Sequence, residues 1–113
     1  NVVIWGTGRP CRDFIFSDDL ADAAIFLLQN YSGNEPINIG TGKDYPIQEV
    51  AGIIREIIGF EGEIIYDTSK PDGVLMKLQD TANLAQLGWT PKTNLQEGIQ
   101  KSYEHFLNTV GQH

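Results

Sequence analysis

The sequence has little of what a disulfide-stabilised, metal-binding or nucleic-acid-binding protein needs. Its 113 residues include one cysteine and two histidines, too few for a disulfide framework or a thiolate metal cluster. Lysine and arginine number 8 against 15 acidic residues, which gives a net charge of -7. Because no basic run is present to release counterions from a phosphate backbone, we expect no nucleic acid and no membrane surface as a partner.

Long apolar runs are also missing. No stretch approaches the roughly 20 apolar residues that cross a bilayer, and no charged-then-apolar signal segment opens the chain. The single Cys11 fits a reducing compartment, so the sequence predicts a cytoplasmic protein. Hydrophobic residues make up 41% of the chain, enough for one modest core.

The chain opens on an apolar strand instead of a cap or a fraying terminus. Residues 2–5 run directly into the glycine-rich turn Gly6-Thr7-Gly8. Natural domains usually begin with a less ordered segment. We therefore expect that Asn1 is not a natural domain boundary.

Strand-like and helix-like apolar periods alternate along the chain, which favours a mixed α/β fold. About four helices are expected, beginning at Ser17, after Pro46, near Asp80 and after Asn94. Short strands are predicted at residues 2–5, 13–16, 36–39 and 63–67.

Local signals predict how these helices are bounded. Gly59 and Gly88 stand where C-cap glycines would end the second and third helices. Asn94, followed by Glu97, resembles a capping box for the last one. Ser17 is the predicted N-cap of the first helix, whose expected buried stripe comprises Leu20, Ala23, Ala24, Leu27 and Leu28.

Two segments carry candidate binding chemistry. Arg9 and Arg12 lie in and after the opening turn, where a guanidinium can take a phosphate in a bidentate fork, although exposed arginines are also common. Trp5 can flank a ring or sugar, or belong to the core. The turn at residues 69–73, with Lys77, offers ammonium groups for a diphosphate and a carboxylate for sugar hydroxyls, but a plain surface loop has the same composition.

Two further patterns are interpreted as accidental. Tyr66 and Lys70 have the Tyr-x-x-x-Lys spacing of dehydrogenases, but Tyr66 ends a predicted strand and Pro71 disfavours a helix at Lys70. The run Gly40-Thr41-Gly42 lacks the third glycine of a dinucleotide fingerprint and is predicted to be a tight turn.

The order of these segments resembles the C-terminal part of extended short-chain dehydrogenase/reductases of the NAD-dependent epimerase/dehydratase family that act on nucleotide sugars. The resemblance runs over nearly the whole chain and is carried by residues 4–8, 12–21, 37–42, 69–77 and 87–89. It implies that residues 1–113 are a C-terminal nucleotide-sugar-binding domain. An N-terminal Rossmann domain outside this chain would bind NADP(H) and supply the catalytic residues, and the full-length protein would be a homodimer.

The resemblance also implies roles for individual residues. Trp5 would line the pocket of a GDP-sugar, with Ile4 adding an apolar contact. Arg12 and Lys77 would contact the diphosphate, and Asp72 would hydrogen-bond within the same pocket. The implied reaction is the epimerisation and NADPH-dependent reduction of GDP-4-keto-6-deoxy-mannose. No catalytic, cofactor-binding or metal-binding residue is expected in the chain itself.

Two alternatives stay open at this point. The chain can be the same region of an epimerase or dehydratase for another nucleotide sugar. It can also be a free-standing nucleotide-sugar-binding module without a catalytic partner. The base of the nucleotide does not follow from the residues alone.

Overall fold

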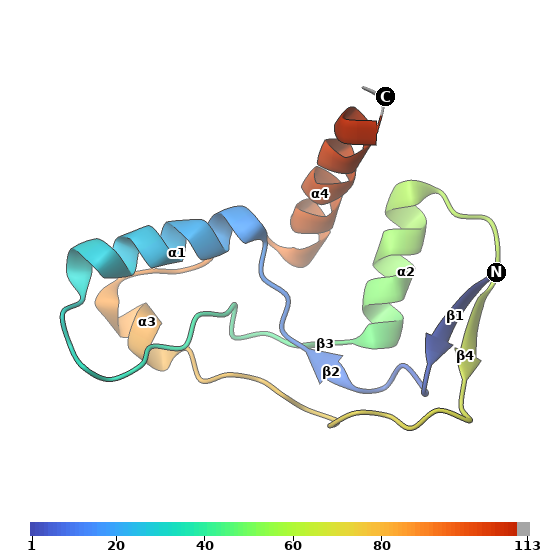
Figure 1. Cartoon of the computed structure of the whole chain (residues 1–113), viewed down its shortest axis with the longest axis horizontal. Coiled ribbons are helices and arrows are strands. Elements are labelled where there is room, and N and C mark those ends of the chain that lie inside the picture. Colours follow the sequence, from blue (N-terminus) through green and yellow to red (C-terminus); the bar gives the residue numbers. More distant parts are fainter. Residues whose placement is uncertain (111–113) are drawn as a thin grey trace.

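The computed structural model describes residues 1–110, which form a flat molecule of 48 × 38 × 19 Å (Figure 1). The predicted mixed α/β fold with about four helices is confirmed. The elements in chain order are β1 (Val2–Trp5), β2 (Cys11–Arg12), α1 (Ser17–Asn30), β3 (Tyr45–Pro46), α2 (Ile47–Ile58), β4 (Ile64–Asp67), α3 (Ala82–Leu87) and α4 (Leu95–Val110).

Two small sheets organise one half of the molecule. β1 pairs in parallel with β4 at one end of the long axis, and the backbone N–H of Gly6 extends this ladder by donating to Asp67 at 2.9 Å (Figure 1). β2 pairs antiparallel with β3 near the middle, with Arg12 opposite Tyr45. The parallel pairing brings residues 6–8 and 68–75, far apart in sequence, to the same edge.

The main apolar core lies in the other half, between α1 and α3. Ala23, Leu84 and Trp89 are 0%, 1% and 5% exposed. The half-buried side chains packed around them are Ile15, Phe26, Leu27, Ile37 and Ile39. This core is therefore built from α1, α3 and the loop residues around them, not from a sheet.

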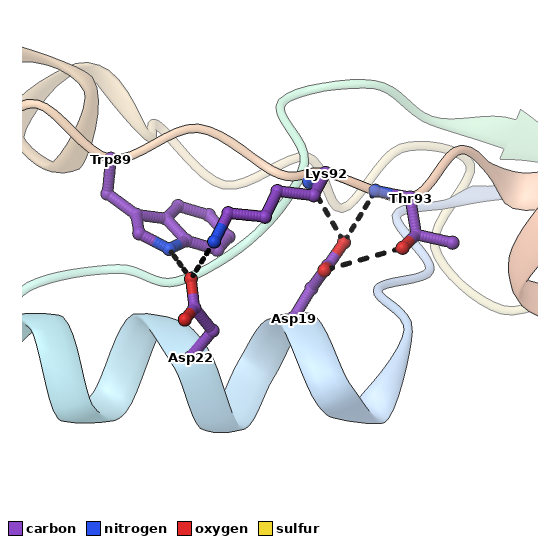
Figure 2. A network of polar contacts seen from close by, with 5 residues as sticks. All are labelled: Asp19, Asp22, Trp89, Lys92 and Thr93. Carbon is purple, nitrogen blue, oxygen red and sulfur yellow. Dashed lines mark hydrogen bonds and ion pairs between the residues drawn. The ribbon is translucent and has the colours of Figure 1, made fainter.

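Two acidic residues of α1 attach the segment after α3 to this core (Figure 2). Asp19, which is 4% exposed, accepts hydrogen bonds from the backbone N–H groups of Lys92 and Thr93 at 3.2 and 2.9 Å. Asp22 accepts a 2.9 Å bond from the indole of Trp89 and lies 3.2 Å from the Lys92 ammonium. Asp19 can thus be buried because its carboxylate has donors, whereas the carboxylate of Asp22 stays partly exposed.

The predicted helix ends are confirmed where glycine or asparagine marks them. α2 and α3 end at Gly59 and Gly88, both in the left-handed conformation. The first turn of α4 is capped by Asn94, whose Oδ1 accepts from the Glu97 N–H at 2.8 Å. α4 packs against α2. Within residues 1–110, no helix is long and apolar enough to cross a membrane.

The predicted strands at 13–16 and 36–39 are wrong, because both segments are loops. Asp13 accepts hydrogen bonds from the turn at residues 40–42, which draws the chain away from a strand partner. The apolar alternation of Ile37 and Ile39 reflects packing on the core of α1 and α3, not pairing in a sheet.

The details predicted for α1 are also wrong in part. The N-cap position is Phe16, and Ser17 is the first helical residue. Ala23 is buried and Leu27 half-buried, but Leu20, Ala24 and Leu28 are exposed, Leu28 by 84%. The face of α1 that lies against residues 89–93 carries carboxylates, whose hydrogen bonds compensate for the loss of water. Some of the apolar residues of α1 therefore lie on the exposed face.

Candidate functional site

The turn after β1 and the loop after β4 are joined by one pair of residues. The backbone N–H of Thr7 donates to Asp72 Oδ1 at 2.8 Å, and the Thr7 hydroxyl donates to Oδ2 at 2.7 Å. A Cβ added to Gly6, which has φ +90°, would lie 2.2 Å from Asp72 Oδ1. The glycine permits this close approach of carboxylate and backbone.

Arg12 holds the same loop from β2. Its Nη1 donates to the carbonyl oxygens of Cys11 at 2.7 Å and Val74 at 2.6 Å. The backbone N–H of Cys11 donates to the Leu75 carbonyl at 2.7 Å. Because one guanidinium nitrogen makes both bonds and a guanidinium has five N–H donors in all, Arg12 keeps donors for a ligand.

Between these segments lies a cavity of about 180 Å³. Its lining combines a tryptophan, an arginine and a carboxylate with small or apolar residues. The lining residues are Trp5, Gly8, Pro10, Arg12, Ile47, Asp72 and Gly73. The fold therefore gathers Trp5, Arg12 and Asp72, three of the five residues expected to bind a ligand, and their binding role stays a prediction.

Ile4 and Lys77 lie outside this cavity lining. Successive strand residues face opposite sides of a sheet, so Ile4 points away from the side of Trp5. It lines a separate apolar cavity against α2, beside Val50 and Ile54. Lys77 is exposed in the loop that leads to α3. In this arrangement Ile4 supports β1 on α2, whereas Trp5 borders the cavity.

Trp5 presents a large aromatic surface, 71% exposed. The ammonium of Lys70 lies 5.3 Å from the centroid of its ring, a cation–π contact. Tyr66 belongs to β4 and Lys70 to the following turn, so the Tyr-x-x-x-Lys spacing does not lie on one helix face. The interpretation of that spacing as accidental is confirmed.

The charges of the cavity are of both signs. The hydrogen bond from the Thr7 backbone, followed by that from its hydroxyl, lowers the pKa of Asp72 below its usual value, and Arg9 contributes by its positive charge. Asp72 is therefore ionised at neutral pH beside the permanently charged Arg12. Such a site can accept hydrogen bonds from hydroxyl groups at Asp72 and bind an anion at Arg12.

The glycine-rich turns do not fit a dinucleotide cofactor. The backbone N–H groups of Thr41 and Gly42 donate to the carboxylate of Asp13 at 2.9 and 3.1 Å. In the turn after β1, the Thr7 N–H is taken by Asp72 in the same way. Protein carboxylates thus occupy backbone donors of both turns, and neither turn leads directly into a helix whose N-terminus could bind a pyrophosphate. Nor do residues 1–110 gather three or more metal-ligating side chains into one group.

Sequence reasoning overlooked Thr7. Its only local signal is its position between two glycines, which marks a tight turn but gives no partner for the hydroxyl. That partner lies 65 positions further along the chain.

The chain is similar in sequence and in structure to known proteins. The sequence profile of the NAD dependent epimerase/dehydratase family matches residues 1–40. The chain is 50% identical over 109 residues to GDP-L-fucose synthase 1 of Arabidopsis thaliana, covering 96% of this chain and 34% of the plant protein. The chain is thus similar in sequence to members of the NAD-dependent epimerase/dehydratase family.

Solved structures with the extended short-chain dehydrogenase/reductase fold are similar to this chain. A GDP-L-fucose synthetase of Naegleria fowleri bound to NADP has a TM-score of 0.90 at 30% identity, covering 96% of this chain and 35% of that one. A GDP-6-OMe-4-keto-L-xylo-heptose reductase of C. jejuni gives 0.87 at 44% identity, with coverages of 95% and 34%. The chain spans about a third of the length of these relatives.

Proposed function

We propose that residues 1–113 are the nucleotide-sugar-binding region of a GDP-L-fucose synthase. The observation that carries the proposal is the cavity that Trp5, Arg12 and Asp72 share. In this assignment Arg12 contacts the diphosphate, Asp72 accepts hydrogen bonds from sugar hydroxyls, and Trp5 borders the ligand. The likeness to the Arabidopsis thaliana enzyme, which extends over nearly the whole chain, supports the GDP-sugar as ligand.

The proposal also includes Lys77 and Ile4 as ligand contacts, although neither lines the cavity. Lys77 would have to swing in with its exposed loop to reach the diphosphate. Ile4 would act through the packing of β1 on α2. Neither of the two lines the cavity, so Arg12 is the better target for a first experiment.

The activity proposed for the whole enzyme is the epimerisation of GDP-4-keto-6-deoxy-mannose and its NADPH-dependent reduction to GDP-L-fucose. NADP(H) would bind in a Rossmann domain outside these residues, and the Naegleria fowleri relative bound to NADP supports this choice of cofactor. We further propose a cytoplasmic homodimer. Gel filtration and fractionation of the intact protein test these two points.

The test measures the binding of GDP to the intact protein by calorimetry. Removing a charge-assisted, bidentate contact to phosphate is expected to weaken GDP binding in Arg12→Ala by about tenfold or more. Arg9→Ala is the matched control, because Arg9 is exposed on the same turn and lies outside the cavity lining. Equal affinity for GDP in wild type and Arg12→Ala would refute the role of Arg12.

Enzyme kinetics give a second readout. Arg12→Ala should raise the KM for the GDP-sugar and leave the affinity for NADPH unchanged, because the cofactor is assigned to another domain. A melting temperature equal to that of the wild type shows that the variant is folded, which is necessary because Arg12 also donates to Val74.

A second candidate is a reductase for another GDP-sugar. The 44% identity to the GDP-heptose reductase of C. jejuni favours it. Turnover of GDP-4-keto-6-deoxy-mannose and of a GDP-keto-heptose by the same preparation separates the two. Binding of a GDP-sugar without turnover of either substrate would favour a binding module.

A further inference from the structure

We propose that Thr7 is a positioning residue for ligand binding, which holds Asp72 as the acceptor for sugar hydroxyl groups in the cavity. The inference rests on the proposed function, because it requires a nucleotide sugar as the ligand. It adds a residue, and assigns the sugar hydroxyls to Asp72 and the phosphates to Arg12.

The Thr7 hydroxyl is fixed in its direction. It accepts a hydrogen bond of 3.2 Å from the backbone N–H of Arg9 and donates its own proton to Asp72 Oδ2 at 2.7 Å. The Thr7 N–H holds the other carboxylate oxygen at 2.8 Å. A carboxylate that accepts a hydrogen bond at each oxygen cannot rotate freely, and each oxygen still has a lone pair for another donor.

The loop around Asp72 depends on few attachments. Every residue from 71 to 80 is exposed, so burial of side chains does little to place it. Besides the bonds from Thr7, Arg12 donates to Val74, the Cys11 N–H donates to Leu75, and Asn38 donates to Asp80. Within residues 1–110, the hydrogen bonds to the Asp72 carboxylate itself come from Thr7, so its orientation depends on Thr7.

Charge decides what Asp72 can contact. A carboxylate and a diphosphate repel each other, whereas a carboxylate accepts hydrogen bonds from hydroxyl groups readily. Arg12, whose guanidinium lies against Gly73 and donates to Val74, attracts the diphosphate. The ligand is therefore oriented with its phosphates toward Arg12 and a sugar hydroxyl toward Asp72.

Two probes distinguish the contact with sugar hydroxyls from the contact with phosphates. GDP-mannose carries sugar hydroxyls and a diphosphate, whereas inorganic diphosphate carries only the latter. Thr7→Val removes the hydroxyl at constant shape and is expected to weaken the binding of GDP-mannose about five- to tenfold, the effect of one lost hydrogen bond. Inorganic diphosphate should bind to this variant within a factor of about two of the wild type, since Arg12 is untouched.

Two further variants control for structural damage. Thr7→Ser keeps the hydroxyl and should restore the affinity for GDP-mannose. Thr41→Val removes a hydroxyl that donates to Asp13 in a similar half-buried turn outside the cavity, and should leave both affinities unchanged. All titrations use the intact protein.

Two results overturn the inference: unchanged GDP-mannose binding by Thr7→Val, or an equal loss of affinity for both probes, which means general loosening of the loop. If the wild type binds neither probe, the proposed function fails instead, and the two failures are thereby distinguished.

Discussion

The indole nitrogen of Trp89 donates a hydrogen bond of 2.9 Å to the carboxylate of Asp22, which joins the segment after α3 to the middle of α1 (Figure 2). The same carboxylate pairs with Lys92. Asp19, one turn earlier, receives the backbone of residues 92 and 93. Two carboxylates on one helix face thus position the connection that leads into α4.

Acid should weaken this attachment. The hydrogen bonds from Trp89 and Lys92 lower the pKa of Asp22 in the folded chain, so its stabilising effect is present above the unfolded pKa and is lost as pH falls through the folded value. We expect the urea concentration at the midpoint of unfolding to decrease as the pH falls below about 4. Asp22→Asn should lose less stability than the wild type between pH 5 and pH 3. Parallel curves of unfolding free energy against pH for the two proteins would contradict this role of Asp22.

Asp19→Ala should destabilise the chain at neutral pH. It removes the acceptor of two partly buried backbone N–H groups, which costs about 1–3 kcal/mol. The neighbouring Asp18 is exposed in the first turn of α1, so Asp18→Ala loses only a favourable interaction with the helix dipole, about 0.3–1 kcal/mol. Urea unfolding measures both, and equal losses would mean that Asp19 acts only through the helix dipole.

Leu84→Ala should reduce the free energy of unfolding by about 2–5 kcal/mol, the usual result of opening a cavity in a core. Leu84 is 1% exposed at the centre of the α1–α3 core. Leu87 lies on the same helix and is 36% exposed, so Leu87→Ala should cost clearly less. Thermal melts of the two variants provide the check, and a similar fall in melting temperature for both would contradict the described core.

Glycine-to-alanine changes should have opposite effects at two positions. Gly52 lies within α2 with no atom within 4 Å of an added Cβ, so Gly52→Ala should stabilise by about 0.5–1 kcal/mol. Gly6→Ala places its Cβ against Asp72 at a positive φ and should both destabilise the chain and weaken GDP-mannose binding. A Gly6→Ala variant with wild-type binding would contradict the described contact with Asp72.

Much of the local structure could be predicted because its signals lie close together in sequence. The apolar period of α2 and its terminal Gly59, or the pair Asn94 and Glu97 before α4, act within one or two helical turns. The errors at residues 13–16 and 36–39 have a different origin. Alternating apolar residues suit a strand, but a strand forms only where a neighbouring strand can pair with it. Ile37 and Ile39 instead pack against the core formed by Ala23, Leu84 and Trp89.

The candidate site also combines residues that the sequence indicates with residues that only the tertiary structure reveals. Trp5, Arg12 and Asp72 were recognised from residue type and from the order of segments, and the fold places all three around one cavity. Ile4 and Lys77 were selected on the same grounds, but strand alternation and an exposed loop place them elsewhere. Thr7 was not selected because the chemistry of a threonine is defined by its partner.

The sequence by itself determined the ends of α2 and α3 at Gly59 and Gly88, the Asn94 cap of α4, and the set of aromatic and charged residues available for a ligand, since these follow from local conformational preferences and residue chemistry. Only the tertiary structure decided which carboxylates meet which donors. Thr7 and Asp72 are 65 positions apart, and Asp22 and Trp89 are 67 apart. No local preference encodes such pairs, because they form only when the parallel pairing of β1 with β4 and the packing of α1 on α3 bring distant segments together.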